Sequence, residues 1–413
     1  MTTSHDLERS LGAWMQSAAD EGLPDYLDEI VHRVALERQR AWWSSPERWL
    51  PVDTTLRLSP VPRAAWLLVI LALVFALGAA IAIVGSLPRH ADPFGPARNG
   101  SLVYSGANGD LYVFDPATDR SKSLVMGPEV DLSPNFSPDG SRIVFGRETG
   151  LAGQYLLMIA NADGRNVRAL SPPLVGLEWA MWSPDSSRLA VVAGPEGAKS
   201  LSILGLDGTA LPILERDLEP EQVQWRPDGR ELVFRGYDPD LVSFGLYVVR
   251  ADGTGLRAIL PPTFSEEHWQ EPALSPDGTR IMYTQWWGDA YPGGHLYVVD
   301  VDSGDAQVLE FDGDFESDYI AEWSPDGSQI VFNQGTAQER YSVAVGPAGG
   351  GHAVRLGPEQ SWDSAASTAF SPDGSKVIAL YGNGSGWILP VSGAPGQRLP
   401  ATDFLGTWQR LPR

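Results

Sequence analysis

The 413-residue chain contains no cysteine and only six histidines. Without cysteine it forms no disulfide and no thiolate site, so its stability has to come from packing. The histidines are scattered, and none has the spacing of a His/Cys metal site. Basic residues are also scarce, because 30 Lys and Arg stand against 52 Asp and Glu, a formal charge of −22. Such acidity disfavours nucleic acid and favours cationic partners.

The usual sequence signatures of catalysis are missing as well. No Gly-x-Ser-x-Gly nucleophile elbow follows the repeats described below, and no Gly-x-Gly-x-x-Gly loop precedes a helix. A hydrolase with two carboxylates in a central channel stays open as an alternative, although the sequence specifies no such pair. We therefore expect a protein that is not an enzyme and has no cofactor, with Ca²⁺ as a candidate ion.

The chain does contain a twelve-residue sequence motif, which occurs six times and is referred to below as the repeated phrase. The first copy, Pro134 to Phe145, reads PNFSPDGSRIVF. The others begin at Ala180, Val223, Pro272, Ala321 and Thr368, at intervals of 43 to 49 residues. Self-similarity at this period indicates propeller blades or solenoid repeats.

Each copy has the composition of a β-hairpin. An apolar segment leads into Ser-Pro-Asp-Gly, and a β-branched and aromatic run follows. Proline presets φ, Asp suits the next turn position, and Gly accepts the left-handed conformation. Two copies deviate, since Ser186 replaces the glycine and Arg226 replaces the first serine. The repeated Asp could be read as a metal ligand or an acid, but six scattered copies favour turn chemistry.

Two further strands follow each hairpin, which gives the four strands of a propeller blade. The segments from Ser101, Asp110 and Arg120 match the second, third and fourth strands of one more blade. The segment from Asp403 matches its missing first strand. We therefore predict an all-β, seven-bladed propeller whose C-terminal strand closes the N-terminal blade, with six blades as the alternative. Closure removes two exposed sheet edges.

The region before the repeats predicts a membrane anchor. Residues 1–63 contain two amphipathic segments with helical spacing, and residues 64–86 are 23 positions without a charge. At 1.5 Å per residue these span roughly 34 Å, enough to cross a bilayer. Arginines cluster before this span, which places the N-terminus in the cytoplasm and the rest outside. We predict a cytoplasmic helical region (1–63), a transmembrane helix (64–86), a Pro-rich tether (87–98) and a propeller (99–413) in the cell membrane.

Connectivity also predicts which face of the propeller looks at the membrane. The Ser-Pro-Asp-Gly turns share one face, here named the turn face, and the tether enters the split blade on that side. The opposite face, here named the loop face, carries the loops between second and third strands and those that enter each first strand. We expect the turn face to look at the membrane and the loop face to look outward.

A carboxylate precedes each innermost strand, and these acids are expected to gather at the outer mouth of the channel. They are Asp131, Glu178, Glu221, Glu271, Asp318, Asp363 and Asp403. Seven like charges in a ring destabilise one another unless cations, a basic peptide or bridging arginines offset them. The sequence leaves open a binding site or a plain solvated acidic surface.

Two other features of the loop face are candidate sites. Trp286, Trp287 and Tyr291 lie in a long loop, and exposed aromatic side chains beside charges suit a protein or sugar partner. They could equally fold over a neighbouring blade. Asp312, Asp314, Glu316 and Asp318 alternate like calcium ligands but lack the closing glutamate of a complete calcium loop.

The repeated phrase resembles the WD-like repeat of TolB-type propellers, also found in relatives of prolyl peptidases. The resemblance covers about residues 99–413 and implies the fold, together with a protein-binding platform in the bacterial envelope. The chain departs from TolB in its predicted anchor and in lacking the α/β domain that precedes the TolB propeller. The arrangement is also similar to bacterial membrane proteins that accompany alternative sigma factors.

The leading functional prediction is a single-pass membrane protein that displays a binding propeller outside the cell. Its partner on the loop face would be a protein or peptide. The first alternative is an anti-sigma-like or sensory regulator in which residues 1–50 hold a cytoplasmic partner. The second alternative is the surface hydrolase considered above.

Overall fold

The computed structural model describes residues 95–214, 218–264, 269–286, 294–312, 317–336, 340–361, 366–382, 384–399 and 404–412. The chain divides after Leu87 into two units, and every described residue belongs to the second. The described residues are built of strands without a helix, so the predicted all-β class is confirmed for them. The predicted segments 1–63 and 64–86 lie outside the described residues. Within the described part, no helix has the length and apolarity to cross a bilayer.

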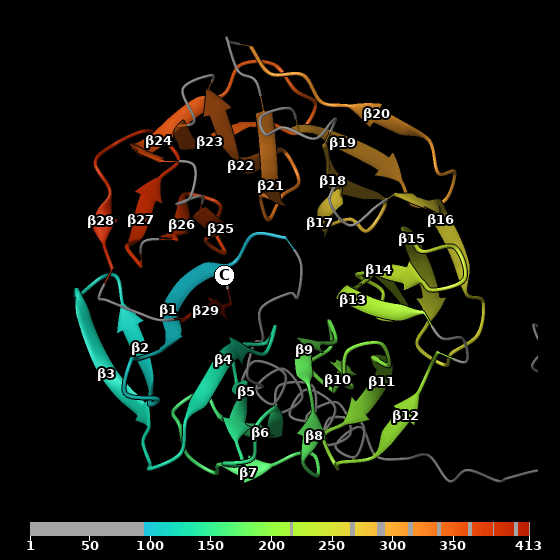
Figure 1. The fold of residues 1–413 in the computed structure, drawn as a ribbon. Helices are drawn as coiled ribbons and strands as arrows, with labels where there is room; N and C mark the ends of the chain where they lie inside the picture. Colours follow the sequence, from blue (N-terminus) through green and yellow to red (C-terminus); the bar gives the residue numbers. More distant parts are fainter. Residues whose placement is uncertain are drawn as a thin grey trace, which may run out of the picture. The chain divides into compact units, whose positions relative to one another are not determined.

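The described strands form seven antiparallel sheets arranged around a central axis, which confirms the seven-bladed propeller (Figure 1). Blade 1 consists of β29 (Phe404–Leu411), β1 (Arg98–Ser105), β2 (Leu111–Asp115) and β3 (Arg120–Val125). Blade 2 consists of β4 (Asp131–Phe136), β5 (Arg142–Glu148), β6 (Gln154–Asn161) and β7 (Arg168–Ala169), with β8 (Leu174–Val175) also on β6. Blade 3 consists of β9 (Leu177–Trp182), β10 (Arg188–Ala193), β11 (Ser200–Gly205) and β12 (Ala210–Pro212).

The other four blades repeat the same meander, with the first strand innermost. Blade 4 consists of β13 (Glu219–Trp225), β14 (Glu231–Asp238), β15 (Ser243–Arg250) and β16 (Arg257–Phe264). Blade 5 consists of β17 (Trp269–Leu274), β18 (Arg280–Trp286), β19 (Gly294–Asp300) and β20 (Ala306–Val308). Blade 6 consists of β21 (Ser317–Trp323), β22 (Gln329–Thr336), β23 (Arg340–Pro347) and β24 (Val354–Ser361). Blade 7 consists of β25 (Ala366–Phe370), β26 (Lys376–Tyr381), β27 (Gly386–Pro390) and β28 (Gln397–Arg398).

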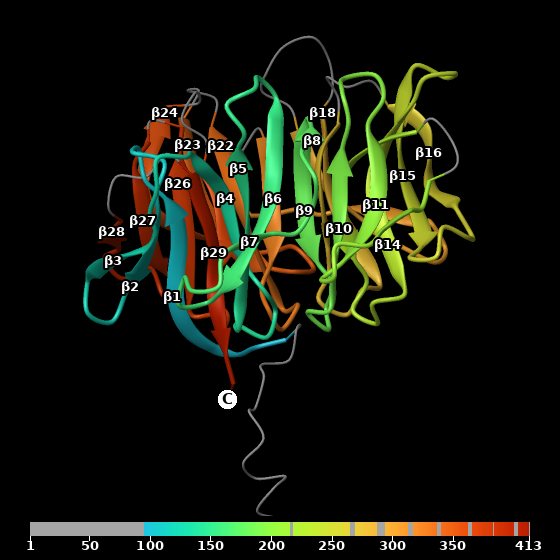
Figure 2. The same ribbon diagram turned by 90° about the horizontal axis from the view of Figure 1, so that it is seen from below.

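Blade 1 is closed by the two ends of the propeller sequence, as predicted. β29 pairs antiparallel with β1, with Leu102 opposite Trp408 and Arg98 opposite Leu411. The last strand therefore becomes the innermost strand of the first blade, and its end lies on the same side as the start of β1 (Figure 2). β29 thereby covers the inner edge of β1, which would otherwise be free to pair with another molecule.

The hydrophobic core lies between the blades rather than in one central mass. The cluster between blades 3 and 4, for example, combines Val192 and Leu201 with Trp225 and Phe234. A cluster of the same kind joins blade 7 to blade 1 through Ile378 and Trp408. Burial of each such side chain stabilises the fold by about 1.5–3 kcal/mol. Each sheet therefore packs against both of its neighbours.

Tryptophans of the inner strands add a polar link between neighbouring blades. The indole N–H of Trp225 donates to the carbonyl of Met181 at 3.1 Å, and that of Trp323 donates to Ala273 at 2.9 Å. Trp182 makes the equivalent bond to Asn135 at 3.3 Å. Each of these three tryptophans therefore has two roles, since its ring fills the core and its N–H bonds to the preceding blade.

The contacts of the repeated aspartate support turn chemistry. In the copy at residues 324–329, Asp326 Oδ1 accepts from Ser324 Oγ at 2.7 Å and from the Ser328 backbone N–H at 3.0 Å. Ser324 Oγ in turn accepts from the Gln329 backbone N–H at 2.9 Å. The hydrogen bond from Ser324, then that from the Ser328 backbone, lowers the pKa of Asp326 and outweighs the effect of burial. The carboxylate is thus held inside its own turn.

Both deviating copies are compensated by local contacts. Ser186 adopts φ +59°, the left-handed conformation that glycine has in the other copies, and its Oγ accepts from the Asp139 backbone N–H at 3.1 Å. Arg226, in place of serine, pairs with Glu231 at 2.9 Å. At Gly278 both backbone conformation and packing require glycine. Its φ is +72°, and a Cβ would overlap the Pro227 ring of the preceding blade.

The chain enters the propeller on the turn face. The backbone N–H of Ala97 donates to the carbonyl of Pro372 at 2.7 Å, and Asn99 Oδ1 accepts from the Asp373 backbone N–H at 3.0 Å. Both acceptor and donor belong to the Ser-Pro-Asp-Gly turn of blade 7. The first described residues therefore lead into β1 from this face, as the connectivity predicted.

Candidate functional site

On the loop face, Asp131 begins the innermost strand of blade 2 and is paired with a cation. Its carboxylate receives two hydrogen bonds from Arg147 on β5, Nε to Oδ1 at 2.7 Å and Nη2 to Oδ2 at 2.8 Å. The Asp131 side chain is 3% exposed. Burial raises the pKa of Asp131, and the bond and charge of Arg147 oppose that rise. The acid is thus a buried half of a bidentate ion pair.

Glu178 and Glu221 lie on neighbouring inner strands and share one cation. Lys199, from the loop between β10 and β11, places its Nζ 3.1 Å from a carboxylate oxygen of each. Its side chain is only 10% exposed. Burial opposes the charge of Lys199, but the hydrogen bonds to Glu221 and Glu178 outweigh it and raise the pKa of the ammonium group. One lysine therefore links blade 3 to blade 4 at the loop face.

Arg235 extends this network along blade 4. Its Nη1 lies 3.3 Å from Glu221 Oε2, and its guanidinium lies 3.8 Å above the centre of the Phe244 ring. Glu221 and Arg235 stand directly opposite each other in the register of β13 and β14. The chain Glu178–Lys199–Glu221–Arg235 therefore alternates in charge, and repulsion between the two glutamates is offset by two cations.

The remaining predicted site residues cannot be assembled in the same way. Glu271 and Asp318 belong to β17 and β21, but their side chains lie outside the described residues, as does the side chain of Trp286 at the end of β18. Asp312 is exposed, and its backbone N–H donates to Gly351 at 2.8 Å. The predicted residues that lie wholly outside the described part are Asp314, Glu316, Asp363, Asp403, Trp287 and Tyr291.

The described part of the loop face does not bring acids together around a metal position. No group of three or more His, Cys, Asp or Glu side chains suited to a metal occurs among the described residues. Asp131, Glu178 and Glu221 instead face Arg147, Lys199 and Arg235. These three cations are the residues that the sequence analysis did not identify. The sequence held a signal for two of these cations. Arg147 and Arg235 each lie late in the second strand of a blade whose first strand begins with an acid.

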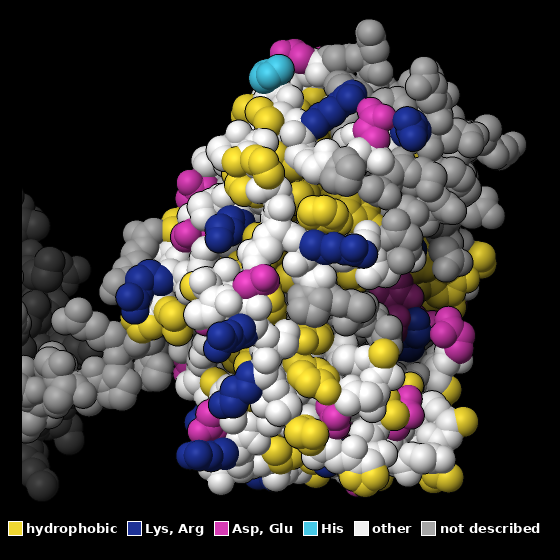
Figure 3. Space-filling view, turned by 90° about the vertical axis from the view of Figure 1, so that its left-hand side faces the viewer, with side chains coloured by type: hydrophobic (Ala, Val, Ile, Leu, Met, Phe, Trp, Pro, Cys, Tyr) yellow, Lys and Arg dark blue, Asp and Glu magenta, His cyan; other side chains and the backbone are white. Residues whose placement is uncertain are grey.

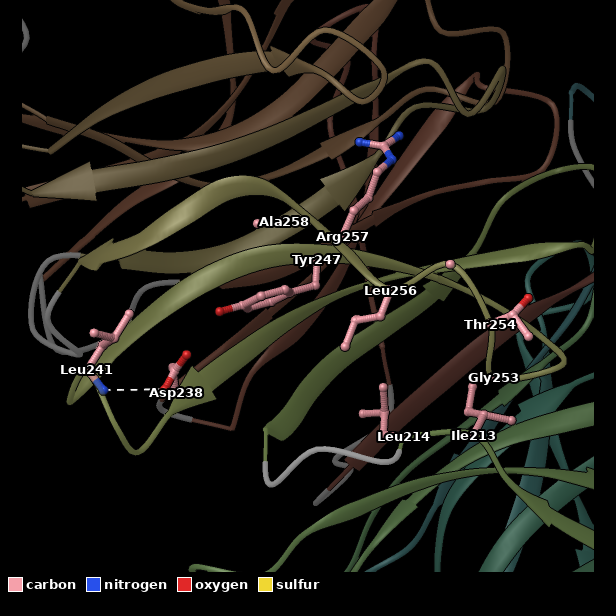
Figure 4. A pocket seen from close by; sticks show the side chains of 11 residues that line it. Ile213, Leu214, Asp238, Leu241, Tyr247, Gly253, Thr254, Leu256, Arg257 and Ala258 are labelled. Carbon is pink, nitrogen blue, oxygen red and sulfur yellow. Dashed lines mark hydrogen bonds between the residues drawn. The ribbon is translucent and has the colours of Figure 1, made fainter.

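A cavity of about 690 Å³ lies on the rim, where the end of β12 approaches β15 and β16. It is lined by Ile213, Leu214, Tyr247 and Leu256, with Asp238 near one end (Figure 4). Asp238 Oδ1 accepts from the Leu241 backbone N–H at 3.3 Å, so its carboxylate holds the loop that follows β14. The lining is polar and apolar in similar measure, and Asp238, Thr254 and Arg257 do not define one kind of ligand.

The fold and the paired charges describe a closed seven-bladed propeller with a charged loop face. A family model described as "TolB beta propeller domain" matches residues 146–399. This match covers more than half of the chain. The chain therefore belongs to the TolB-type propeller family, as the repeated phrase indicated.

Individual relatives are distant. An uncharacterized protein of Agrobacterium fabrum is 23% identical over 247 residues, which cover 57% of this chain and 81% of the relative. An oligogalacturonate lyase in complex with manganese has a TM-score of 0.57 at 18% identity, covering 73% of this chain and 89% of the lyase. TolB from Acinetobacter baumannii has a TM-score of 0.48 at 17% identity, and the match covers 75% of this chain and 82% of TolB. At 18% identity the lyase structure shows a shared fold alone.

Proposed function

We propose that this protein is a single-pass membrane protein that presents its propeller outside the membrane as a platform for a protein or peptide partner. The observation that carries the proposal is the point at which the chain enters the propeller. Ala97 and Asn99 contact the turn of blade 7 on the turn face. An anchor that precedes them leaves the whole loop face available to a partner.

The organisation of the loop face is consistent with a preformed binding surface. Lys199 and Arg235 hold Glu178 and Glu221 in fixed positions, so a partner would not have to order these long side chains. Charges arranged in this way favour selectivity and rapid association more than raw affinity. We therefore expect the partner to carry basic side chains that engage acids at the edge of this network, such as Glu196, whose side chain is 90% exposed.

Site-specific photo-crosslinking of the full chain in its membrane tests this proposal. A photoreactive amino acid at Glu196 on the loop face should form a defined adduct with a partner. The matched position is Arg165, whose side chain is 84% exposed and lies in the turn between β6 and β7 on the turn face. We expect at least a tenfold stronger adduct from position 196.

The crosslinked partner should also be released by charge reversal. Glu196→Lys should weaken the adduct formed from a neighbouring loop-face probe, because it opposes a basic partner. Adducts that come mainly from position 165, or that are unchanged by the reversal, would contradict a loop-face platform. Three alternatives stay predictions from the sequence. They are an anti-sigma-like regulator that uses residues 1–50, a surface hydrolase, and the binding of Ca²⁺.

A further inference from the structure

Three arginines gather between blades 3 and 4 on the turn face. Arg188 is the first residue of β10, Arg230 lies just before β14, and Arg250 ends β15. Together with Leu211 and the turn at Ala251 they line a cavity of about 620 Å³, here named the arginine groove. This concentration of arginine is notable in a chain with 30 basic and 52 acidic residues.

Arg188 is fixed in the groove by its surroundings. Its Nη2 donates to the carbonyl of Gly229 in the next blade at 2.8 Å, and its guanidinium lies 5.1 Å from the centre of the Trp225 ring. Its Nε is buried and finds no acceptor among the described residues. A buried donor without a partner is unfavourable, so an acceptor that reached this N–H would be favoured.

The acids of the groove are largely occupied by other groups. Asp228 Oδ1 accepts from the Arg230 backbone N–H at 2.9 Å, and Asp252 Oδ1 accepts from the backbone N–H and hydroxyl of Thr254 at 2.9 and 2.7 Å. Glu231 pairs with Arg226 at 2.9 Å. Arg230 and Arg250 are exposed, and within the described part of the chain neither has a carboxylate within ion-pair distance. Their guanidinium groups are therefore available to an anion.

Guanidinium groups bind phosphate oxygens through paired hydrogen bonds, which makes a phosphate the best match for the groove. On the side of the propeller drawn in Figure 3, basic side chains are interspersed with acidic and hydrophobic ones. Lipid phosphates held in a plane beneath the turn face would meet the arginines without facing the loop face.

The length of chain outside the described residues makes this contact feasible. Residues 87–98 connect the predicted span to the turn face, and twelve residues reach at most roughly 40 Å. We propose that the arginine groove binds the phosphate headgroup of an anionic phospholipid and so holds the turn face against the bilayer. The proposal rests on the proposed function for the orientation of this face, but its test does not depend on membrane topology.

Vesicle flotation of residues 88–413 tests the groove directly. These residues form a compact unit whose ring closes on itself, so they can be studied without the anchor. We expect them to float with vesicles that contain phosphatidylglycerol and not with phosphatidylcholine alone. Arg230→Gln with Arg250→Gln should lower the partition coefficient about 30-fold, because it removes both direct contacts with the headgroup and each contact contributes roughly fivefold. Both side chains are exposed, so this variant should fold.

A control with a matched loss of charge separates the groove from general electrostatics. Arg120→Gln with Arg165→Gln removes two exposed arginines from the turn face outside the groove and should leave flotation within about threefold of wild type. Equal losses in both variants would overturn the groove, as would flotation that is insensitive to Arg230 and Arg250. Competition by millimolar inorganic phosphate, without any binding to vesicles, would instead assign the groove to a soluble anion and overturn the lipid proposal. None of these outcomes bears on the loop-face platform.

Discussion

Removal of residues 404–413 should abolish the cooperative unfolding transition of the propeller. β29 is the innermost strand of blade 1, and it brings Trp408, 6% exposed, into the core between blades 1 and 7. Loss of a buried tryptophan alone costs about 3–5 kcal/mol. A typical domain has a total stability of about 5–15 kcal/mol, and the truncation also leaves the inner edge of β1 unpaired. Calorimetry should show no sharp transition, and gel filtration should show aggregates.

Two experiments separate ring closure from a general effect of shortening the chain. A peptide of residues 404–413 added in trans should restore a sharp transition by pairing with β1. Gly406→Ala tests the same contact without truncation, because a Cβ there would overlap the Pro134 carbonyl and lie 2.8 Å from the Val103 carbonyl. Gly349→Ala is its control, since a Cβ at Gly349 has no neighbour within 4 Å. A truncated protein that melts sharply at the wild-type temperature would show that the ring does not need closure.

Arg147→Ala should destabilise the propeller by about 3–5 kcal/mol, the usual cost of removing one partner of a buried ion pair. The substitution leaves the Asp131 carboxylate, 3% exposed, without its two hydrogen bonds from the guanidinium. Chemical denaturation at neutral pH measures the loss. Arg165→Ala is the matched control, because it removes one partner of an exposed ion pair. Arg165 Nε lies 3.8 Å from Asp163 Oδ2, and the two side chains are 84% and 54% exposed. We expect it to cost less than about 1 kcal/mol.

The pH dependence of the Arg147→Ala deficit identifies its cause. Burial already raises the pKa of Asp131 above 3.8, and without Arg147 the pKa should rise further. A carboxyl group whose pKa is higher in the folded state is destabilising above that pKa, and the penalty is relieved as the pH falls through it. The deficit should therefore shrink between about pH 7 and pH 4, and Asp131→Asn in the same background should recover part of it. A deficit that is constant over this range would assign the loss to packing.

The fold could be predicted because its information is local and repeated. Each Ser-Pro-Asp-Gly turn is specified by its own residues, and Asp326 shows how completely one carboxylate is used within a single turn. Closure could be predicted because the segments that begin at Ser101 form a blade without a first strand. The segment from Asp403 has the pattern of that missing strand. The pairing of Leu102 with Trp408 confirms that inference over more than 300 residues of intervening sequence.

The chemistry of the loop face could not be predicted in the same way, because it depends on contacts between blades. The acids were visible in the sequence, but Lys199 reaches Glu178 in its own blade and Glu221 in the next. That placement depends on the path of a loop, which no repeat specifies. The arginine groove was missed for the same reason, since Arg188 and Arg250 come from different blades and meet only in the assembled ring.

The most direct test of the proposed membrane orientation uses the absence of cysteine from the chain. Single cysteines at Ser4, Arg165 and Glu196 of the full chain can be labelled in intact spheroplasts with a membrane-impermeant maleimide, free of background. We expect rapid labelling of Glu196→Cys, slower labelling of Arg165→Cys that speeds up in detergent, and labelling of Ser4→Cys only after lysis. Rapid labelling of Ser4→Cys with protection of Glu196→Cys would contradict the account, because the propeller would then lie inside.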